Sequence, residues 1–424
     1  MDRFDIQGGK RLTGEVGVNG AKNAALPLMA AALMGTGTSR LKGIPDLRDI
    51  RTMSALLGQL GVQVDRAADG TIEITPEDDG KVTAPYELVR QMRASVCLLG
   101  PLLARRGRAR VSQPGGCVIG VRPIDLHLKG LGALGAEIEL DGGYIHASAP
   151  ELTGTEIYLG GAQGSTALGT CNVLMAACLA RGRTVIECAA CEPEIVDLAE
   201  FLAKMGARIE GAGSHRIVID GVPSLHGAEH RVVPDRIEAG TFMTAAALTR
   251  GDVTVRGLRV DHLSAVIDTL RRIGVTVDTN GDECRVRAVN QFRAAEVVAL
   301  PYPGLPTDLQ AQITALLATA DGISVVTDKV FPDRFMHVAE LNRMGAQIRK
   351  AGSSAIIVGQ PQLTPAPVMA SDLRASAALV LAAMAADGYT IVHRVYHIDR
   401  GYDRIEQRLN KLGAQIERVQ EDYP

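Results

Sequence analysis

The chain has 424 residues, of which 46% are hydrophobic and 22% charged, with a formal net charge of −3. This length is enough for two or three domains with substantial cores. The charge balance gives no indication of binding to nucleic acid or to an anionic membrane. The start of the chain has no apolar signal region, and the longest apolar run, residues 24–34, is too short to span a bilayer. Seven cysteines without a secretion signal are typical of free thiols, so we expect a cytoplasmic protein without membrane insertion.

One element recurs six times along the chain. An amphipathic stretch ends at a Leu-, Met- or Ile-Gly step, and an alternating strand follows it. We expect an Asp near the start of each stretch to cap a helix and the Gly to end it. The pairs, in chain order, are Asp49 and Gly61, Asp125 and Gly135, Asp197 and Gly206, Asp261 and Gly274, Asp333 and Gly345, and Asp403 and Gly413.

Each unit also contains a second, Ala-rich helix that is apolar nearly all round and is therefore expected to be buried. A Gly and a β-type run follow each of these helices. Six such units exceed one core, so two α/β domains of three units each are predicted, with the division near residue 230. A site between two domains is then the default expectation. The buried helices are predicted to begin near Lys22, Arg93, Ser165, Glu238, Thr307 and Ser371.

Cations stand at the start of three buried helices: Lys22, Arg93 and Arg374. A cation at this end opposes the helix dipole, and a bound anion would remove that cost. The alternative is that these cations pair with Asp308, Asp372 or Asp235 across the gap between the domains. Because the pattern recurs at three of six equivalent positions, the sequence favours an anion site.

The longest connection between units, residues 111–123, contains Pro114 and three glycines, a composition that permits positive φ angles and movement. Cys117 lies in it, five residues before Arg122. A thiol close to a guanidinium group ionises more readily and is more reactive. The alternative is a buried structural cysteine. A Gly-flanked loop is a poor place to bury a side chain, so we expect Cys117 to be reactive.

Three other patterns do not indicate a site. Residues 130–135 match the G-x-G-x-x-G pattern of dinucleotide-binding proteins, but here the pattern closes a helix instead of opening one. Cys188 and Cys191 form a lone C-x-x-C without a second ligand pair, so zinc is not indicated. His127, close to the start of a helix, is interpreted as structural. The sequence therefore predicts neither a metal nor a cofactor.

Ten motifs together resemble the UDP-N-acetylglucosamine enolpyruvyl transferases (1-carboxyvinyltransferases) of the EPSP synthase superfamily. The resemblance runs in order along the whole chain. It implies two domains, each an inside-out α/β barrel of three units with its buried helices inside. Residues 1–21 plus 231–424 would form one domain and residues 22–230, with the Cys117 loop, the other, with the active site in the cleft between them. The motifs begin at Lys22, Arg93, Pro114, Arg122, Glu192, Pro234, Pro306, Arg334, Asp372 and Asp399.

The resemblance also implies an activity. The enolpyruvyl group of phosphoenolpyruvate would be transferred to the 3-hydroxyl of UDP-N-acetylglucosamine, and phosphate would leave from a tetrahedral intermediate. This reaction is the first committed step of peptidoglycan synthesis, on which cell shape and division depend, and the family is the target of fosfomycin. Phosphoenolpyruvate and UDP-N-acetylglucosamine are thus the expected partners, with no nucleic acid.

Site residues follow from the same resemblance. Asp308 would take the proton of the sugar hydroxyl, Cys117 would act as general acid toward the methylene carbon, and Lys22 would be the third catalytic residue. The phosphoenolpyruvate site would comprise Lys22, Asn23, Arg122, Arg374 and Arg400. The UDP-sugar site would comprise Asn23, Arg93, Arg122, Pro123, Ile124, Asp125, Leu126, Gln163, Gly164, Ser165, Asp308 and Val330.

One segment departs from the family pattern. Where the family has Ser-Val-Gly-Ala-Thr-Glu-Asn, residues 164–172 place Cys171 at the Glu position, and Cys191 replaces an Arg before Glu-Pro-Glu. Two alternatives therefore stay open: a paralogue that uses a different UDP-sugar acceptor, and an inactive UDP-sugar-binding regulator. The presence of Lys22, Cys117 and Asp308 argues against the inactive regulator.

Overall fold

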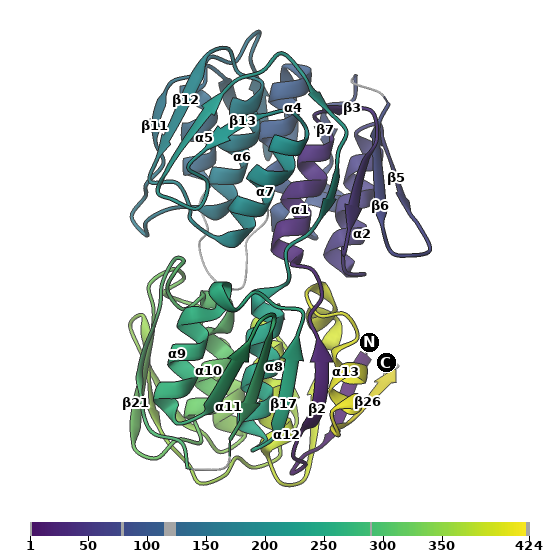
Figure 1. Cartoon of the computed structure of the whole chain (residues 1–424). Helices are drawn as coiled ribbons and strands as arrows, with labels where there is room; N and C mark the ends of the chain where they lie inside the picture. The colour runs from purple at the N-terminus through teal and green to yellow at the C-terminus, as the bar shows by residue number, and fades with distance from the viewer. Residues whose placement is uncertain (1, 78–79, 114–123, 289–290, 421–424) are drawn as a thin grey trace. The chain divides into compact units, whose positions relative to one another are not determined.

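The computed structural model describes residues 2–77, 80–113, 124–288 and 291–420, which form two compact units (Figure 1). We call the unit of residues 2–19 and 234–420 the terminal unit, because it contains both ends of the described chain. The middle unit comprises residues 20–113 and 124–233. Each unit repeats one arrangement three times: an inner helix, a strand, an outer helix and a strand pair.

In the middle unit, the inner helices are α1 (Lys22–Ala32), α4 (Leu99–Arg106) with the 3-10 turn η1 (Arg93–Leu98) before it, and α6 (Ala167–Cys178). The outer helices are α2 (Arg48–Gln59), α5 (Asp125–Ala133) and α7 (Pro193–Lys204), and a short helix α3 (Tyr86–Val89) precedes η1.

Three four-stranded sheets and one strand pair belong to the middle unit. The first sheet has the order β16 (Glu229–Arg231), β4 (Ser39–Lys42), β6 (Ile72–Pro76), β5 (Val62–Arg66). The second is β7 (Thr83–Ala84), β8 (Arg108–Ser112), β10 (Tyr144–Ser148), β9 (Glu137–Asp141). The third is β11 (Glu156–Tyr158), β12 (Arg183–Glu187), β14 (Arg216–Asp220), β13 (Arg208–Glu210). The separate pair is β15 (Leu225–His226) with β3 (Gly35–Thr36).

The terminal unit has the inner helices α8 (Arg236–Leu248), α10 (Gln310–Leu317) with the 3-10 turn η3 (Thr307–Leu309) before it, and α12 (Leu373–Ala385). Its outer helices are α9 (Ser264–Ile273), α11 (His337–Arg343) and α13 (Ile405–Lys411). The 3-10 turns η2 (Val260–Leu263) and η4 (Val395–Arg400) precede α9 and α13.

The terminal unit also has three four-stranded sheets. Their orders are β2 (Thr13–Gly17), β17 (Asp252–Arg256), β19 (Glu283–Arg287), β18 (Thr276–Asn280); then β20 (Glu296–Ala299), β21 (Ile323–Asp328), β23 (Ser354–Val358), β22 (Gln347–Ala351); and β24 (Val368–Met369), β25 (Tyr389–His393), β1 (Asp2–Gln7), β26 (Gln415–Gln420).

The start of the chain completes sheets that the second half builds. Strand β1 lies between β25 and β26 and is antiparallel to both. In the other four-stranded sheets this third position belongs to the second strand of the pair that follows the outer helix. Strand β2 runs parallel to β17, as the purple and green arrows in Figure 1 show. The first 19 residues therefore belong to the terminal unit by hydrogen bonding.

The inner helices are buried along almost their whole length, and they pack against one another within each unit. Every residue of 237–248 and of 374–384 is buried, and α10 contacts both α8 and α12. Close approach requires glycine: a Cβ on Gly100 would lie 2.2 Å from the Asn172 carbonyl oxygen. Small Ala side chains and close contacts at Gly thus build a core that contains few aromatic residues. The predicted fold class is confirmed.

The predicted helix ends are confirmed, whereas the predicted Asp caps are wrong. All six repeat glycines have positive φ, from 72° at Gly61 to 107° at Gly206. No side-chain cap hydrogen bond occurs on the six outer helices as far as they are described. Asp49 and Asp197 lie inside α2 and α7 and are buried, with their carboxylates bound to Lys22 and His230. Tertiary pairing of these carboxylates therefore replaces the local cap.

Two glycines at the end of α5 can test whether the repeated Gly is required by its left-handed backbone conformation. Gly132 lies inside the helix, Gly135 has φ +98° just after it, and a Cβ on either would meet no atom closer than 3.9 Å. Gly132→Ala should raise the free energy of unfolding by about 0.5–1 kcal/mol, because Ala favours a helix. Gly135→Ala should lower it by about 1–2 kcal/mol, because its conformation is left-handed. Urea denaturation measures both, and changes of the same sign would contradict this explanation.

Candidate active site

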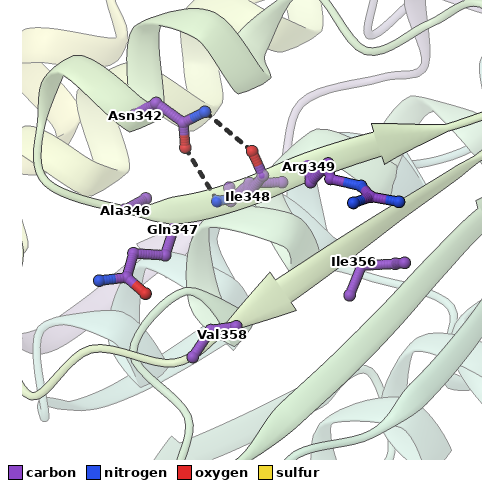
Figure 2. Close-up of a pocket in the computed structure, with 7 residues that line it drawn as sticks. All are labelled: Asn342, Ala346, Gln347, Ile348, Arg349, Ile356 and Val358. Carbon is purple, nitrogen blue, oxygen red and sulfur yellow. Dashed lines mark hydrogen bonds between the residues drawn. The ribbon is translucent and has the colours of Figure 1, made fainter.

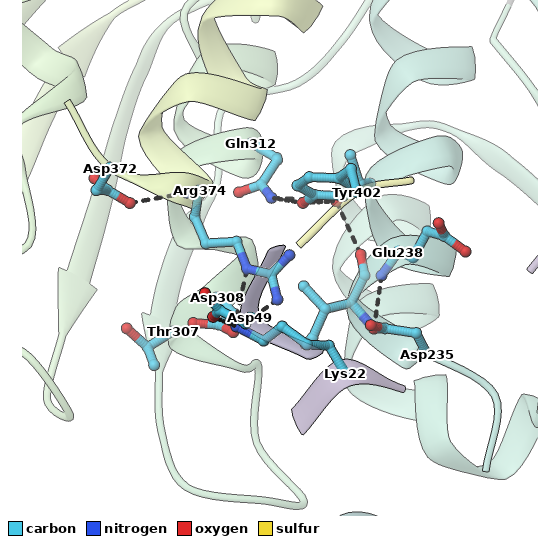
Figure 3. Close-up of polar contacts among 12 residues, drawn as sticks. Lys22, Asp49, Asp235, Glu238, Thr307, Asp308, Gln312, Asp372, Arg374 and Tyr402 are labelled. Atoms are coloured by element: carbon cyan, nitrogen blue, oxygen red, sulfur yellow. Dashed lines mark hydrogen bonds and ion pairs between the residues drawn. The ribbon is translucent and has the colours of Figure 1, made fainter. Parts of the chain in front are cut away.

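Asp308 of the terminal unit carries a carboxylate that two arginines bind. Figure 3 labels one of them, Arg374, beside Asp308. Nη1 of Arg334 donates to Oδ1 at 2.7 Å, and Nε and Nη2 of Arg374 donate to Oδ2 at 3.2 and 3.1 Å. The Asp308 side chain is 23% exposed and that of Arg374 only 2%. Two buried cations thus hold a partly exposed carboxylate in place, and such ion pairs favour its ionised form.

Arg374 is held at the start of α12 by a capped helix end. The Asp372 carboxylate accepts hydrogen bonds from the backbone N–H groups of Arg374 at 2.8 Å and Ala375 at 3.2 Å. Burial lowers the pKa of Arg374, but Tyr402 and Asp308 oppose this and raise it above its usual value. The guanidinium therefore stays charged, and its buried Nη1 donates no hydrogen bond of normal geometry within the described residues.

Tyr402 joins the starts of the inner helices in one polar network. Its hydroxyl lies 2.9 Å from Oγ1 of Thr241 on α8 and accepts from Nε2 of Gln312 on α10 at 3.3 Å. Burial raises the pKa of Tyr402, so its hydroxyl keeps its proton. The Arg374 guanidinium lies 5.1 Å from the Tyr402 ring centroid. The network therefore fixes α8, α10 and the guanidinium relative to one another.

Val330 is connected to Asp308 by a short path of hydrogen bonds. Asp328, at the end of β21, accepts from Oγ1 of Thr307 at 2.6 Å and from the Val330 N–H at 2.9 Å. Nη1 of Arg334 also donates to Oγ1 of Thr307, at 3.2 Å. Burial raises the pKa of Asp328. The structure thus brings three predicted residues of this unit, Asp308, Arg374 and Val330, into one neighbourhood, and Arg400 lies at the end of η4, two residues before Tyr402.

In the middle unit, Lys22 is the first residue of α1, and its Nζ lies 3.2 Å from Oδ2 of Asp49 (Figure 3). Both side chains are buried, whereas the neighbouring Asn23 is exposed. Ala21 precedes the helix and offers no side-chain cap to its N–H groups. Lys22 and Arg374 thus both have a carboxylate partner within their own unit. For Arg374 this partner is Asp308, as the alternative to an anion site proposed, but the pair does not cross a gap between the domains.

A second group of predicted residues lies where α5 begins. Gly161 and Gly164 exchange two backbone hydrogen bonds of 2.9 and 3.0 Å and form a tight turn around Gln163. A Cβ on Gly161 would lie 3.0 Å from Leu126, so this turn contacts the first turn of α5. The turn that contains Gln163 and Gly164 therefore contacts Leu126, which follows Ile124 and Asp125 at the start of α5, while Ser165 follows the turn and Arg93 begins η1.

The segment that departs from the family pattern is part of the core. Thr166 caps α6 by accepting from the Gly169 N–H at 3.2 Å, and Cys171 is buried. Burial raises the pKa of the Cys171 thiol well above its usual value. The side chain at the family's Glu position is therefore a neutral core residue here.

The structural interpretation of His127 is confirmed. Its Nδ1 lies 2.7 Å from the side-chain nitrogen of Asn172, which also donates to the Val96 carbonyl at 2.8 Å. The Asn172 oxygen accepts from the Gly100 N–H at 2.9 Å. His127 and Asn172 thus connect α5, α6 and α4 in the core.

Cys117, Arg122 and Pro123 lie outside the described residues. Sequence reasoning assigned no site role to Arg334 or Asp328, which bind Asp308 and Thr307, and it assigned Asp49, which binds Lys22, only as a helix cap. One signal could have identified Arg334: it lies three residues before an outer helix, as Arg122 does.

Within the described ranges, no group of three His, Cys, Asp or Glu side chains is placed to hold a metal ion. None of the helices described there is both long enough and apolar enough to cross a membrane.

Comparison with known proteins gives a consistent result. The family model of EPSP synthase (3-phosphoshikimate 1-carboxyvinyltransferase) matches residues 6–409. A UDP-N-acetylglucosamine 1-carboxyvinyltransferase of Desulfosudis oleivorans is 51% identical over 99% of this chain and 100% of its own length. UDP-N-acetylglucosamine 1-carboxyvinyltransferase 2 of Carboxydothermus hydrogenoformans is 55% identical with the same coverage.

Solved structures agree with these relatives. The enolpyruvyl transferase NikO from Streptomyces tendae superposes with a TM-score of 0.89 at 27% identity, covering 99% of both chains. EPSP synthase from Acinetobacter baumannii, with a TM-score of 0.75 at 21% identity over 99% of this chain and 100% of its own, shares the fold. On these matches, which span nearly the whole chain, it belongs to the EPSP synthase family and, within it, to the UDP-N-acetylglucosamine 1-carboxyvinyltransferases.

Proposed function

We propose that this chain transfers the enolpyruvyl group of phosphoenolpyruvate to the 3-hydroxyl of UDP-N-acetylglucosamine and releases phosphate. The observation that carries the proposal is the Asp308 carboxylate, fixed by Arg374 and Arg334 at the start of an inner helix. Its partial exposure leaves it accessible to a substrate hydroxyl, and its ion pairs favour the basic form. The full-length relatives named for this reaction support the same assignment.

Asp308 would act as general base. As the sugar oxygen attacks C2 of phosphoenolpyruvate, the hydroxyl proton passes to Asp308, and a proton from a general acid adds to the methylene carbon. The resemblance assigns that second proton to Cys117, which lies outside the described residues. The resulting tetrahedral intermediate then loses phosphate together with a proton from the new methyl group, which restores the enol double bond. Positioned groups of this kind contribute about 10²- to 10⁴-fold each to the rate.

The cations would bind the negative charge of phosphoenolpyruvate. Arg374 is buried and charged, and its Nη1 donor is not used in a normal hydrogen bond among the described groups. A guanidinium can bind a carboxylate or phosphate with two donors at once. Lys22 lies at the uncapped start of α1, where N–H groups and the helix dipole also favour an anion. Asn23, Arg122 and Arg400 would complete this set.

The UDP-sugar would contact the start of α5 and the turn around Gln163. The residues proposed for it there are Ile124, Asp125, Leu126, Gln163, Gly164 and Ser165, with Arg93, Asn23, Arg122, Pro123, Asp308 and Val330 beyond them. In the cell, this reaction would be the first committed step of peptidoglycan synthesis and would take place in the cytoplasm.

A second candidate keeps the chemistry and changes the acceptor. Its basis is Cys171, which is neutral and buried where the family has Glu, and which follows in sequence the turn proposed for the UDP-sugar. A paralogue with another UDP-sugar as acceptor would retain Asp308 and its arginines. Only the comparison of acceptors in one assay distinguishes the two.

A phosphate-release assay tests both candidates. The unmodified chain should release phosphate from phosphoenolpyruvate with UDP-N-acetylglucosamine, and Cys117→Ser or prior treatment with fosfomycin should lower the rate by about 10²-fold or more, because a weaker acid replaces the thiol or the thiol is blocked. Cys191→Ser serves as the control thiol and should leave the rate unchanged. Release only with another UDP-sugar would favour the paralogue, and no release with any UDP-sugar would contradict both.

Asp308→Asn tests the general base. An amide keeps the shape but cannot take a proton, so kcat should fall by about 10²- to 10⁴-fold, while UDP-N-acetylglucosamine still binds in calorimetry. Asp333→Asn is the matched control, because Asp333 belongs to the same unit and its exposed carboxylate binds Lys350 at 3.0 Å. It should leave kcat unchanged. A decrease in kcat of less than about threefold in Asp308→Asn would rule out this role for Asp308.

A further inference from the structure

In each repeat, the strand that connects the inner helix to the outer helix ends at or just before an equivalent position, six residues after a Gly. At this position Asp328 is the last residue of β21. Four of the equivalent residues have a positive φ instead and turn the chain: Gly43, Cys188, Gly257 and Arg394. The repeat of β21 thus departs from these four and places a carboxylate where they turn.

Asp328 is fully buried at this strand end. Burying a carboxylate is costly unless it is hydrogen-bonded. Three donors bind it here: the N–H groups of Val330 at 2.9 Å and Phe331 at 2.7 Å donate to Oδ1, and Oγ1 of Thr307 donates to Oδ2 at 2.6 Å. Since the four equivalent residues turn the chain without a carboxylate, the turn alone does not require Asp328.

The Thr307 hydroxyl has one proton, and Asp328 determines its direction. Burial raises the pKa of Asp328, but its three hydrogen bonds oppose this rise. An ionised carboxylate can only accept, so the hydroxyl proton points to it. The Thr307 oxygen is then an acceptor for Nη1 of Arg334 at 3.2 Å. The same Nη1 donates to Oδ1 of Asp308 at 2.7 Å, so Asp328 is connected to Asp308 through Thr307 and Arg334.

We propose that Asp328 is a positioning residue of the transfer reaction. One of its oxygens orients Thr307 and, through it, the guanidinium that holds the Asp308 carboxylate, while the other fixes the turn at Val330. The inference rests on the proposed function, in which Asp308 is the base and Val330 contacts the UDP-sugar. Because both oxygens belong to one carboxylate, they hold the base and the sugar contact in one geometry. A misplacement of 1 Å in such an arrangement can cost about 10²-fold in rate.

Asp328→Asn separates the roles of the two oxygens. The amide oxygen still accepts from the N–H groups of Val330 and Phe331, but the NH₂ group cannot accept the Thr307 proton and donates to the Thr307 oxygen instead. It then competes with Arg334 for that oxygen. In the phosphate-release assay kcat should fall by about 10- to 10²-fold. The KM for UDP-N-acetylglucosamine should stay unchanged, because the turn that contacts the sugar is retained.

Thr307 variants test whether the effect passes through the hydroxyl. Thr307→Val keeps the shape and loses the hydroxyl, so it should lower kcat as Asp328→Asn does. Thr307→Ser keeps the hydroxyl and should retain the rate of the unmodified chain. The double variant of Asp328→Asn with Thr307→Val should be no slower than the slower single variant, because groups that act along one path are not additive. Losses that multiply in the double variant would overturn the proposal.

Asn342 provides the structural control (Figure 2). Its side chain accepts from the Ile348 N–H at 3.0 Å and donates to the Ile348 carbonyl at 2.8 Å, so like Asp328 it fixes a backbone segment of the terminal unit. It lines a hollow to which no residue proposed for catalysis contributes. Asn342→Ala should therefore lower the unfolding temperature and leave kcat and KM unchanged.

The outcomes separate this inference from the function on which it rests. An unmodified chain that releases no phosphate with any UDP-sugar would overturn both. An active chain in which Asp328→Asn and Thr307→Val each lower kcat by less than about threefold would overturn the inference alone, and so would an equal loss of kcat in Asn342→Ala. Thermal unfolding checks that each variant is folded, and if Asp328→Asn is not, the comparison of Thr307→Val with Thr307→Ser decides.

Discussion

The whole molecule depends on one constraint: in each unit three helices are enclosed on all sides. An enclosed helix can carry few polar groups along its length, because each would need a partner inside the protein. Residues 237–248 of α8 and 374–384 of α12 are buried throughout, and their polar members are mostly hydroxyls bonded to their own helix. Charges are thus largely restricted to the helix starts, where Asp235, Asp308 and Arg374 are found.

Buried charges at these starts are costly, and the structure pairs them. Glu238, in the first turn of α8, binds Arg408 of α13 and accepts from the Asn19 N–H at 2.7 Å. Burial raises the pKa of Glu238, and Arg408 opposes that rise. Removing one partner of such a pair typically costs about 3–5 kcal/mol, because the other charge stays buried alone. The Glu238 pair has a structural reason, since it fastens the N-terminal segment to α8. The Arg374–Asp308 pair connects η3 to the start of α12. Replacing a buried ion pair by apolar side chains is often neutral or stabilising, so its presence agrees with the role proposed for it in binding and catalysis.

Local features of the fold could be predicted from the sequence, and long-range pairings could not. Four inner helices, α1, α6, α8 and α12, begin within two residues of the expected positions, because a continuous apolar run next to a polar residue is a local signal. At the other two expected positions a 3-10 turn begins, and α4 and α10 follow it. The glycines at the helix ends were predictable for the same reason. Asp49 and Asp197 were assigned as caps, since a local pattern contains no information about Lys22 or His230. Arg334 was missed because its partner Asp308 lies in another element of the fold.

The repeats explain why spacing alone does not identify a site residue. Arg334 lies three residues before α11 and binds the Asp308 carboxylate from a buried position. Arg259 also precedes an outer helix, α9, but its side chain is exposed and binds Asp261 on the surface. The two arginines differ in the residues at the start of the neighbouring inner helix. Before α10, η3 carries Asp308, which binds Arg334. At the start of α8, Asp235 and Glu238 bind other groups. An arginine at this repeated position therefore binds the inner-helix start where that start carries a carboxylate within reach, and this condition depends on the folded structure.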